Sequence, residues 1–129
     1  MKKQINTGAP WEKRVGYSRA VRVDNIIEVS GTVSVKDGAP YGIGNVYLHT
    51  KRIFEIIADS LTELGGSLDD VVRTKMYVTD IRNQWEDIGR VHGEIFGDIR
   101  PAATMVEVRA LIAPEYLVEI EVTAILQNV

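Results

Sequence analysis

The stretch LGGSLDDVVRTKMYVTDI, residues 64–81, contains the end of one predicted element, the whole of a second and the start of a third. Gly65-Gly66 ends a helix, as glycines commonly do just beyond a helix C-terminus. Residues 71–79 alternate as a strand does, and Asp80 suits the N-cap of a second helix. The two faces of this strand are Val72, Thr74, Met76 and Val78 on one side and Arg73, Lys75 and Tyr77 on the other.

Helical periodicity extends to both sides of this stretch. From about Asn45 to Leu64, apolar side chains recur at spacings of three and four, which predicts a long amphipathic helix. Its stripe is Val46, Thr50, Ile53, Ile57, Leu61 and Leu64. The second helix, ending at Gly97, has the stripe Ile81, Trp85, Ile88, His92 and Ile95. We therefore expect Trp85 to pack on the sheet, His92 to be a packed, hydrogen-bonded histidine, and His49, off the first stripe, to lie on the surface.

Further strands are predicted near both ends of the chain. Residues 18–23 and 26–30 flank Asp24-Asn25, a pair suited to a tight hairpin turn. Residues 102–111 and 117–127 also alternate. The order is two or three strands, helix, strand, helix and two strands, which predicts one two-layer α+β domain over residues 1–129 with both helices on one sheet face.

The other face of the sheet is expected to be charged. It would carry Arg73, Lys75, Glu107, Arg109, Glu119 and Glu121. Two interpretations remain open for it: the face lies in water, as in many antiparallel sheets, or it faces further copies of the chain and its opposite charges pair.

Composition excludes several classes of function. The 129 residues have a formal net charge of −3, so the basic surface that nonspecific nucleic-acid binding needs is not expected. The chain has no cysteine and two histidines, so we expect neither a thiolate site nor a histidine-rich metal site. Metal binding assisted by carboxylates stays open as an alternative, and we assign no metal ligand. No apolar run approaches the roughly 20 residues that span a bilayer, and we expect a cytoplasmic protein without a membrane partner.

Two groups of residues have the chemistry of a site. Glu119 and Glu121 lie two apart on one strand face, a spacing that suits either paired acid–base work or ion pairs with Arg73 or Arg109. Tyr17 and Arg19 flank Ser18 and form either an anion-binding edge or ordinary surface.

Taken together, five segments resemble the RidA/YjgF family of reactive-intermediate deaminases over nearly the whole chain. They are GYSRAV (16–21), VSGT (29–32), LGGSLDDVVRTKMYVTDI (64–81), RPAATMVEV (100–108) and LVEIEVTAI (117–125). The resemblance implies a chorismate-mutase-like fold, with a six-stranded sheet backed by two helices. It also implies a homotrimer whose sheets face inward, with clefts between subunits where 2-imino acids are hydrolysed to 2-keto acids and ammonia without a cofactor.

The resemblance also implies roles for individual residues. Tyr17 matches the family's cleft tyrosine, Ser30-Gly31 its SG pair, and Glu119 the glutamate that places the hydrolytic water. We add Thr104, beside Ala103, to the substrate-binding set.

Three positions depart from the family. The arginine that clamps the substrate carboxylate is Ala103 here, the cleft asparagine is Gly89, and the glutamine of the YSQA motif is Arg19. The chain thus resembles an arginine-lacking branch, and we expect weak 2-imino acid deamination unless Arg19 replaces the clamp.

Three functions remain open at this point. The first is hydrolysis of a small imine-like compound through Glu119, and the second is noncatalytic binding of a small metabolite in the same cleft. The third, a ribonuclease as attributed to some relatives, is disfavoured by the net charge.

Overall fold

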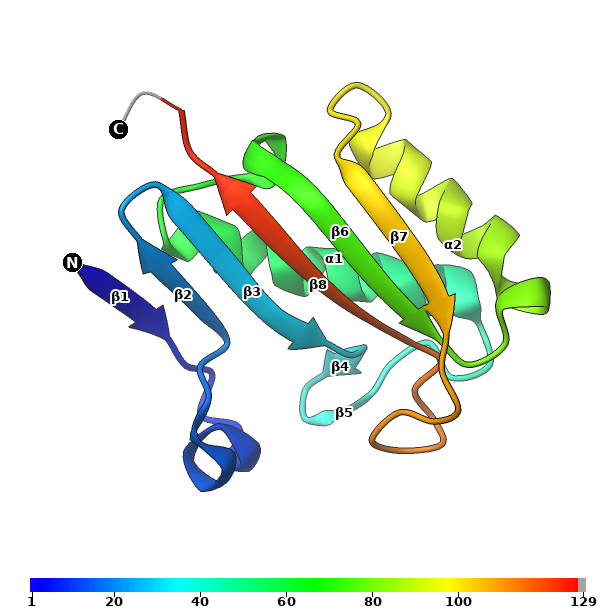
Figure 1. Ribbon diagram of the computed structural model, residues 1–129. Coiled ribbons are helices and arrows are strands. Elements are labelled where there is room, and N and C mark those ends of the chain that lie inside the picture. Colours follow the sequence, from blue (N-terminus) through cyan, green and yellow to red (C-terminus); the bar gives the residue numbers. More distant parts are fainter. Residues whose placement is uncertain (128–129) are drawn as a thin grey trace.

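A computed structural model describes residues 1–127 and shows a six-stranded sheet with two helices behind one face (Figure 1). The strand order is β1-β2-β3-β8-β6-β7, in which β6 and β7 are parallel and the other neighbours antiparallel. The strands are β1 (Lys2–Ile5), β2 (Ala20–Val23), β3 (Ile26–Thr32), β6 (Val71–Val78), β7 (Ala102–Glu107) and β8 (Val118–Ile125), with a separate hairpin of β4 (Val35–Lys36) and β5 (Ala39–Pro40). The predicted two-layer α+β fold is confirmed.

The helices are α1 (Val46–Glu63) and α2 (Ile81–Phe96). At the start of α1, the side chain of Asn45 accepts a hydrogen bond from the backbone N–H of Leu48 at 3.1 Å. Beyond its end, Gly65 has φ +88°, a conformation that favours glycine. The predicted start, stripe and end of this helix are therefore confirmed.

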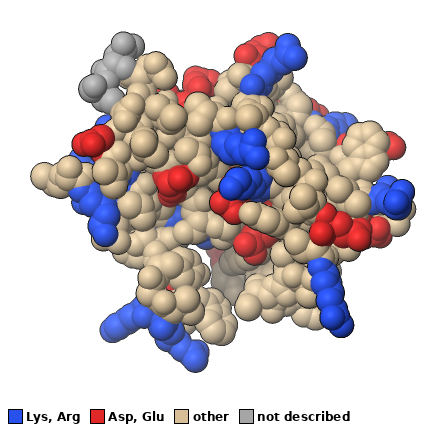
Figure 2. All heavy atoms as spheres, viewed as in Figure 1, with Lys and Arg blue, Asp and Glu red and all other residues tan. Residues whose placement is uncertain are grey.

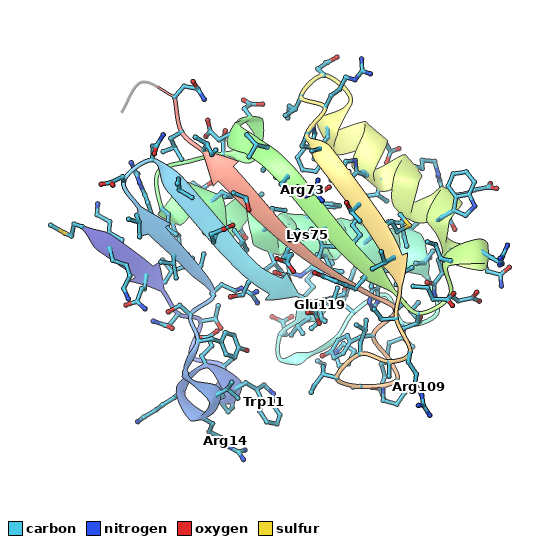
Figure 3. All side chains as sticks on the ribbon, in the orientation of Figure 1. Trp11, Arg14, Arg73, Lys75, Arg109 and Glu119 are labelled. Atoms are coloured by element: carbon cyan, nitrogen blue, oxygen red, sulfur yellow. The ribbon has the colours of Figure 1, made fainter. Side chains whose placement is uncertain are left out.

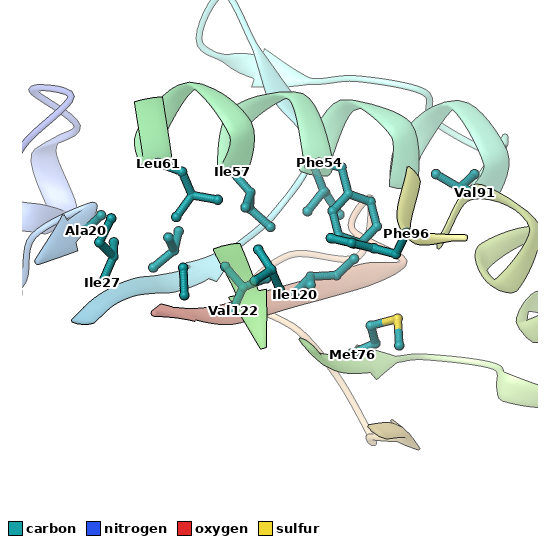
Figure 4. Packing of buried hydrophobic residues seen from close by; sticks show 14 of the residues in the cluster. Ala20, Ile27, Phe54, Ile57, Leu61, Met76, Val91, Phe96, Ile120 and Val122 are labelled. Carbon is teal, nitrogen blue, oxygen red and sulfur yellow. The ribbon is translucent and has the colours of Figure 1, made fainter. Parts of the chain in front are cut away.

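The core lies between α1 and the sheet (Figure 4). Phe54, Ile57 and Leu61 of α1 are almost completely buried against Ile27, Ile120 and Val122 of the central strands. Among residues 1–127, no helix is long and apolar enough to cross a membrane.

The predicted alternation of buried and exposed residues in β6 is wrong at the start of the strand. The pairing of β6 with β8 shifts between Val71 and Arg73, so Val72 is an extra residue in the strand. As a result Val71 is buried, whereas Val72 is 40% exposed. A bulge of this kind reverses the side on which a side chain lies, which strict alternation does not anticipate.

The predicted stripe of α2 is also partly wrong. The buried residues are Gln84, Ile88, Val91 and Phe96, whereas Trp85 is 52% exposed. The buried face of α2 is thus centred to one side of the predicted stripe. Trp85 follows Gln84 by one position, which is about 100° around the helix, so Trp85 lies outside the buried face.

Asp80 occupies the N-cap position of α2 as predicted, but its carboxylate accepts no backbone hydrogen bond there. The N–H of Ile81 instead donates to Oε1 of Glu107 at 3.0 Å. Glu107 pairs in register with Val78, a core residue, so it lies on the helix side of the sheet and not on the charged face where it was expected.

The prediction made for His92 is confirmed, and the one made for His49 is wrong. His92 is partly buried and within hydrogen-bond distance of Thr74, with 2.9 Å between its Nε2 and the hydroxyl oxygen, as predicted. His49, expected on the surface, has no exposed area, and its Nε2 accepts the backbone N–H of Leu117 at 3.1 Å. Burial lowers the pKa of His49, so the neutral ring that can accept this bond is favoured.

The open face of the sheet carries Arg73, Lys75, Glu119 and Glu121, as expected (Figure 3). The expected ion pairs of the two glutamates with Arg73 or Arg109 are absent from the described chain. Tyr77 donates to Glu121 at 2.7 Å, and Arg73 donates to the hydroxyl of Thr104 at 2.7 Å. Arg109 follows the end of β7 and lies beyond the sheet.

The burial of α2 predicts opposite outcomes for two neighbouring substitutions. Trp85→Ala is expected to lower the free energy of unfolding by less than about 1 kcal/mol, because the ring is half exposed. Ile88→Ala, at a site with no exposed area, is expected to cost about 2–5 kcal/mol. Urea unfolding of both variants checks this, and a larger loss for Trp85→Ala would contradict the observed rotation of α2.

Candidate functional site

A cleft of about 1080 Å³ opens beside the end of β3, between the N-terminal segment and the loop that leads into β8. In the space-filling view, a hollow separates the lobe at lower left from the rest of the molecule (Figure 2). Residues of α1 and of the β4–β5 hairpin line the cleft on its other side.

A bulge in β3 shapes the floor of the cleft. Val29 pairs with Val122 and Thr32 with Ile120, so β3 has one residue more than β8 over this interval. The extra length falls at Ser30-Gly31, the SG pair of the sequence. Bulges interrupt the hydrogen-bond ladder and leave backbone groups that need other partners.

Arg19 supplies those partners. Its Nη2 donates to the carbonyl oxygens of Ser30 and Gly31 at 2.7 and 2.9 Å and lies 2.9 Å from the hydroxyl oxygen of Thr32. The hydroxyl of Ser30 donates to the carbonyl of Ser18 at 2.7 Å. The guanidinium therefore holds the bulge in shape, and a bidentate contact with a ligand carboxylate would have to share its Nη2.

Glu119 lies directly over this bulge. A Cβ at Gly31 would overlap Oε2 of Glu119, so only glycine leaves room for the carboxylate here. Glu119 is partly buried, and loss of water raises its pKa above the ordinary value of 4.5. The positive charge of Arg19 acts in the opposite direction, and Glu121 adds to the increase.

The wall on the N-terminal side is built by a segment that sequence reasoning did not assign. Glu12, in the helical turn Glu12–Gly16, is buried, and its carboxylate accepts hydrogen bonds from the backbone N–H and the hydroxyl of Thr7 at 2.9 and 2.6 Å. This closes the loop and places Trp11 and Tyr17 on the cleft. In the sequence, Glu12 lies in the charged run WEKR, a pattern that is typical of surface residues.

Five of the seven predicted site residues line this cleft: Tyr17, Arg19, Ser30, Gly31 and Glu119. The other two, Ala103 and Thr104, lie on β7 and do not. Because β6 separates β7 from β8, these two side chains do not reach Glu119 within one chain. Over residues 1–127, no group of three or more acidic, histidine or cysteine residues is arranged to hold a metal ion.

Comparisons with known proteins match both the sequence and this fold. The model of the family described as endoribonuclease L-PSP matches residues 8–126. The chain belongs to this family, the RidA/YjgF family.

Two solved RidA/YjgF-type structures resemble the chain closely. A member of the YjgF/YER057c/UK114 family from Mycobacterium tuberculosis is 42% identical, with a TM-score of 0.89, and the match covers 98% of this chain and 100% of that one. A structure from Thermotoga maritima titled as a putative endoribonuclease is 30% identical, with a TM-score of 0.83 and coverages of 98% and 94%.

Curated relatives in this family include one with a stated activity. The 3-aminoacrylate deaminase RutC of Acinetobacter baylyi is 33% identical over 108 residues, which is 81% of this chain and 82% of the relative. An uncharacterized protein of Streptomyces coelicolor is 33% identical over 122 residues, with 95% and 90% covered.

The contacts of Arg19 predict a structural cost for its removal. Arg19→Ala is expected to lower the free energy of unfolding by about 1.5–3 kcal/mol, because the carbonyls of Ser30 and Gly31 lose a charged donor. Arg82→Ala, which removes an exposed arginine of α2, is expected to stay within about 0.5 kcal/mol. Equal losses in chemical denaturation would refute the role of Arg19 in holding the bulge.

Proposed function

We propose that the cleft binds a small imine- or enamine-like metabolite and hydrolyses it, with Glu119 as the proton-transferring group. The observation that supports this most directly is the placement of a partly buried carboxylate over the Gly31 backbone, beside Arg19. Family membership and the activity named for the Acinetobacter baylyi relative point to the same chemistry.

The proposed reaction is addition of water to a C=N bond, followed by loss of ammonia. With the imine nitrogen protonated, Glu119 accepts a proton from water as the oxygen bonds to the imine carbon, which gives a neutral amino alcohol. Glu119 returns this proton to the nitrogen, and as the C–N bond breaks the hydroxyl group passes its own proton to Glu119, which releases it to solvent. The products are a carbonyl compound and ammonia. A carboxyl group with a raised pKa suits the first step, because its carboxylate is a stronger base than that of an ordinary glutamate.

Substrates with a carboxylate next to the imine carbon fit this cleft poorly. The family position that would clamp such a carboxylate is Ala103, and the Nη2 of Arg19 already has three acceptors. Loss of a bidentate arginine removes roughly 1.5–3 kcal/mol per charge-assisted bond, or about ten- to a hundredfold or more in rate. We therefore expect little deamination of freshly generated 2-iminobutyrate.

We also propose that the protein is a homotrimer with the open sheet face inside. Two features support it: this face carries charges of both signs, and Ala103 and Thr104 lie too far from Glu119 in one chain to share its cleft. In such an assembly the β7 strand of one copy would complete the cleft of the next.

Light scattering tests the assembly. The wild-type protein is expected to have the mass of three chains at micromolar concentration. Arg73→Glu is expected to weaken assembly, because an unpaired charge enclosed between copies costs about 3–5 kcal/mol. Arg82→Glu, on the exposed surface of α2, is the matched control and should leave the mass unchanged. A wild-type monomer would refute the proposal.

The catalytic role of Glu119 is tested by Glu119→Gln. The substitution is expected to lower kcat at least about a hundredfold, because the amide cannot accept the proton of water. Imines generated in the cuvette by an amine oxidase serve as substrates, and ammonia release is the measurement. In the wild type, activity should fall as the pH drops through a value above 4.5, since the raised pKa leaves less of the carboxylate ionised at acidic pH.

The same variant separates catalysis from binding alone. If wild type and Glu119→Gln bind a ligand within a few-fold of each other and neither releases ammonia, the protein is a noncatalytic binder that uses the same cleft. An RNA substrate is disfavoured, because carboxylates outnumber guanidinium groups in the cleft lining and repel a phosphodiester backbone.

A further inference from the structure

The cleft has an excess of negative charge. Its lining includes two guanidinium groups, from Arg19 and Arg52. The carboxylates in the same lining number five, from Glu12, Asp37, Asp59, Glu63 and Glu119. With all groups ionised the difference is three negative charges, which disfavours an anionic ligand and favours a cationic one.

Both guanidinium groups are already held by acceptors of the chain itself. Arg19 is bound to the β3 bulge as described above. The Nε of Arg52 donates to the carbonyl of Val35 at 2.8 Å, and its Nη1 donates to Glu55 at 3.2 Å. A bidentate contact of a ligand carboxylate with either guanidinium would therefore include a nitrogen that already donates within the chain.

Three of the carboxylates, in contrast, remain available. Within residues 1–127, the side chains of Asp37, Asp59 and Glu63 take part in no side-chain hydrogen bond or ion pair. Glu12 differs, since Thr7 occupies its carboxylate. The unpaired negative charge thus lies on the α1 and β4–β5 side of the cleft, away from Glu119 along the lining.

The other part of the lining is aromatic and apolar. Trp11, Tyr17 and Tyr116 line the cleft, and so does Ile112, which is 75% exposed. Aromatic faces attract cations. A cation of the chain itself already lies against Trp11, because the Arg14 guanidinium is 5.3 Å from the centroid of the ring. An apolar group on the ligand would cover side chains that otherwise lie in water.

The size of the cleft agrees with a ligand larger than a four-carbon imino acid. At about 1080 Å³ it lies at the upper end of the range of small-molecule pockets, roughly 300–1000 Å³. We propose that the cleft takes a protonated amine or iminium compound that carries an aromatic or other apolar group, and that it discriminates against carboxylates. This inference rests on the proposed function for the location of the site and defines its substrate class.

Three compounds of nearly equal shape test the charge preference: 2-phenylethylamine, phenylacetamide and phenylacetate, which are cationic, neutral and anionic near neutral pH. A Trp85→Phe background leaves Trp11 as the sole tryptophan, so fluorescence reports on the cleft. The amine is expected to bind at least about tenfold more tightly than phenylacetate, with the amide between them.

Two double variants locate the cause of the preference. Asp59→Asn with Glu63→Gln removes two free carboxylates of the cleft and should reduce the preference for the amine several-fold. Glu86→Gln with Asp98→Asn makes the same change in charge at exposed positions outside the lining, and it should leave the preference nearly unchanged.

Three results would overturn the inference. The first is phenylacetate binding as tightly as the amine, and the second is no binding of any of the three compounds up to about 10 mM. The third is an equal change of preference in both double variants, which would assign it to net charge alone. Failure of the proposed catalysis is separate: a protein that prefers the amine but releases no ammonia from any imine retains the binding preference and lacks the hydrolase activity.

Discussion

The hydrogen bonds from Arg19 to the β3 bulge are the contacts on which the geometry of the cleft depends. An extra residue at Ser30-Gly31 frees carbonyl oxygens from the sheet ladder, and one guanidinium nitrogen satisfies them. The bulge in turn brings the Gly31 backbone under Glu119, where a side chain would have to displace the carboxylate. Because the arginine is engaged in this support, it contributes positive charge to the site without offering the free fork that a carboxylate ligand needs.

The two faces of the sheet have different roles. Its helix side is packed with apolar side chains against α1 and α2, and disturbance there affects the fold as a whole. Its open side carries Glu119, Glu121, Arg73 and Lys75, which are polar and only partly covered or exposed. Functional divergence in a RidA/YjgF protein can therefore occur on the open side and in the N-terminal segment while the core is retained.

The charge of the cleft lining bears on the class of ligand that can enter. Five carboxylates and two guanidinium groups line the cleft, and the carboxylates of Asp59 and Glu63 make no side-chain hydrogen bond or ion pair within residues 1–127. This excess of negative charge acts against a negatively charged ligand. Burial is the main cause of the raised pKa of Glu119, and the positive charge of Arg19 acts against it.

The sequence by itself determined the elements whose signals are long and local. The structure agrees with the predicted α1 stripe, its Asn45 cap and Gly65 end, and the alternation in β8. It also agrees with the approach of Tyr17, Ser30, Gly31 and Glu119 that the family resemblance implies. Only the tertiary structure decided which side of an element a given residue faces and which residues from distant parts of the sequence it contacts. A bulge exposed Val72, a small rotation of α2 exposed Trp85, and the 109–117 loop buried His49 by offering it a backbone N–H. The charge of the cleft was likewise beyond the sequence, because Glu12, Asp37, and the α1 residues Asp59 and Glu63 come from three separate segments that only folding brings around one cavity.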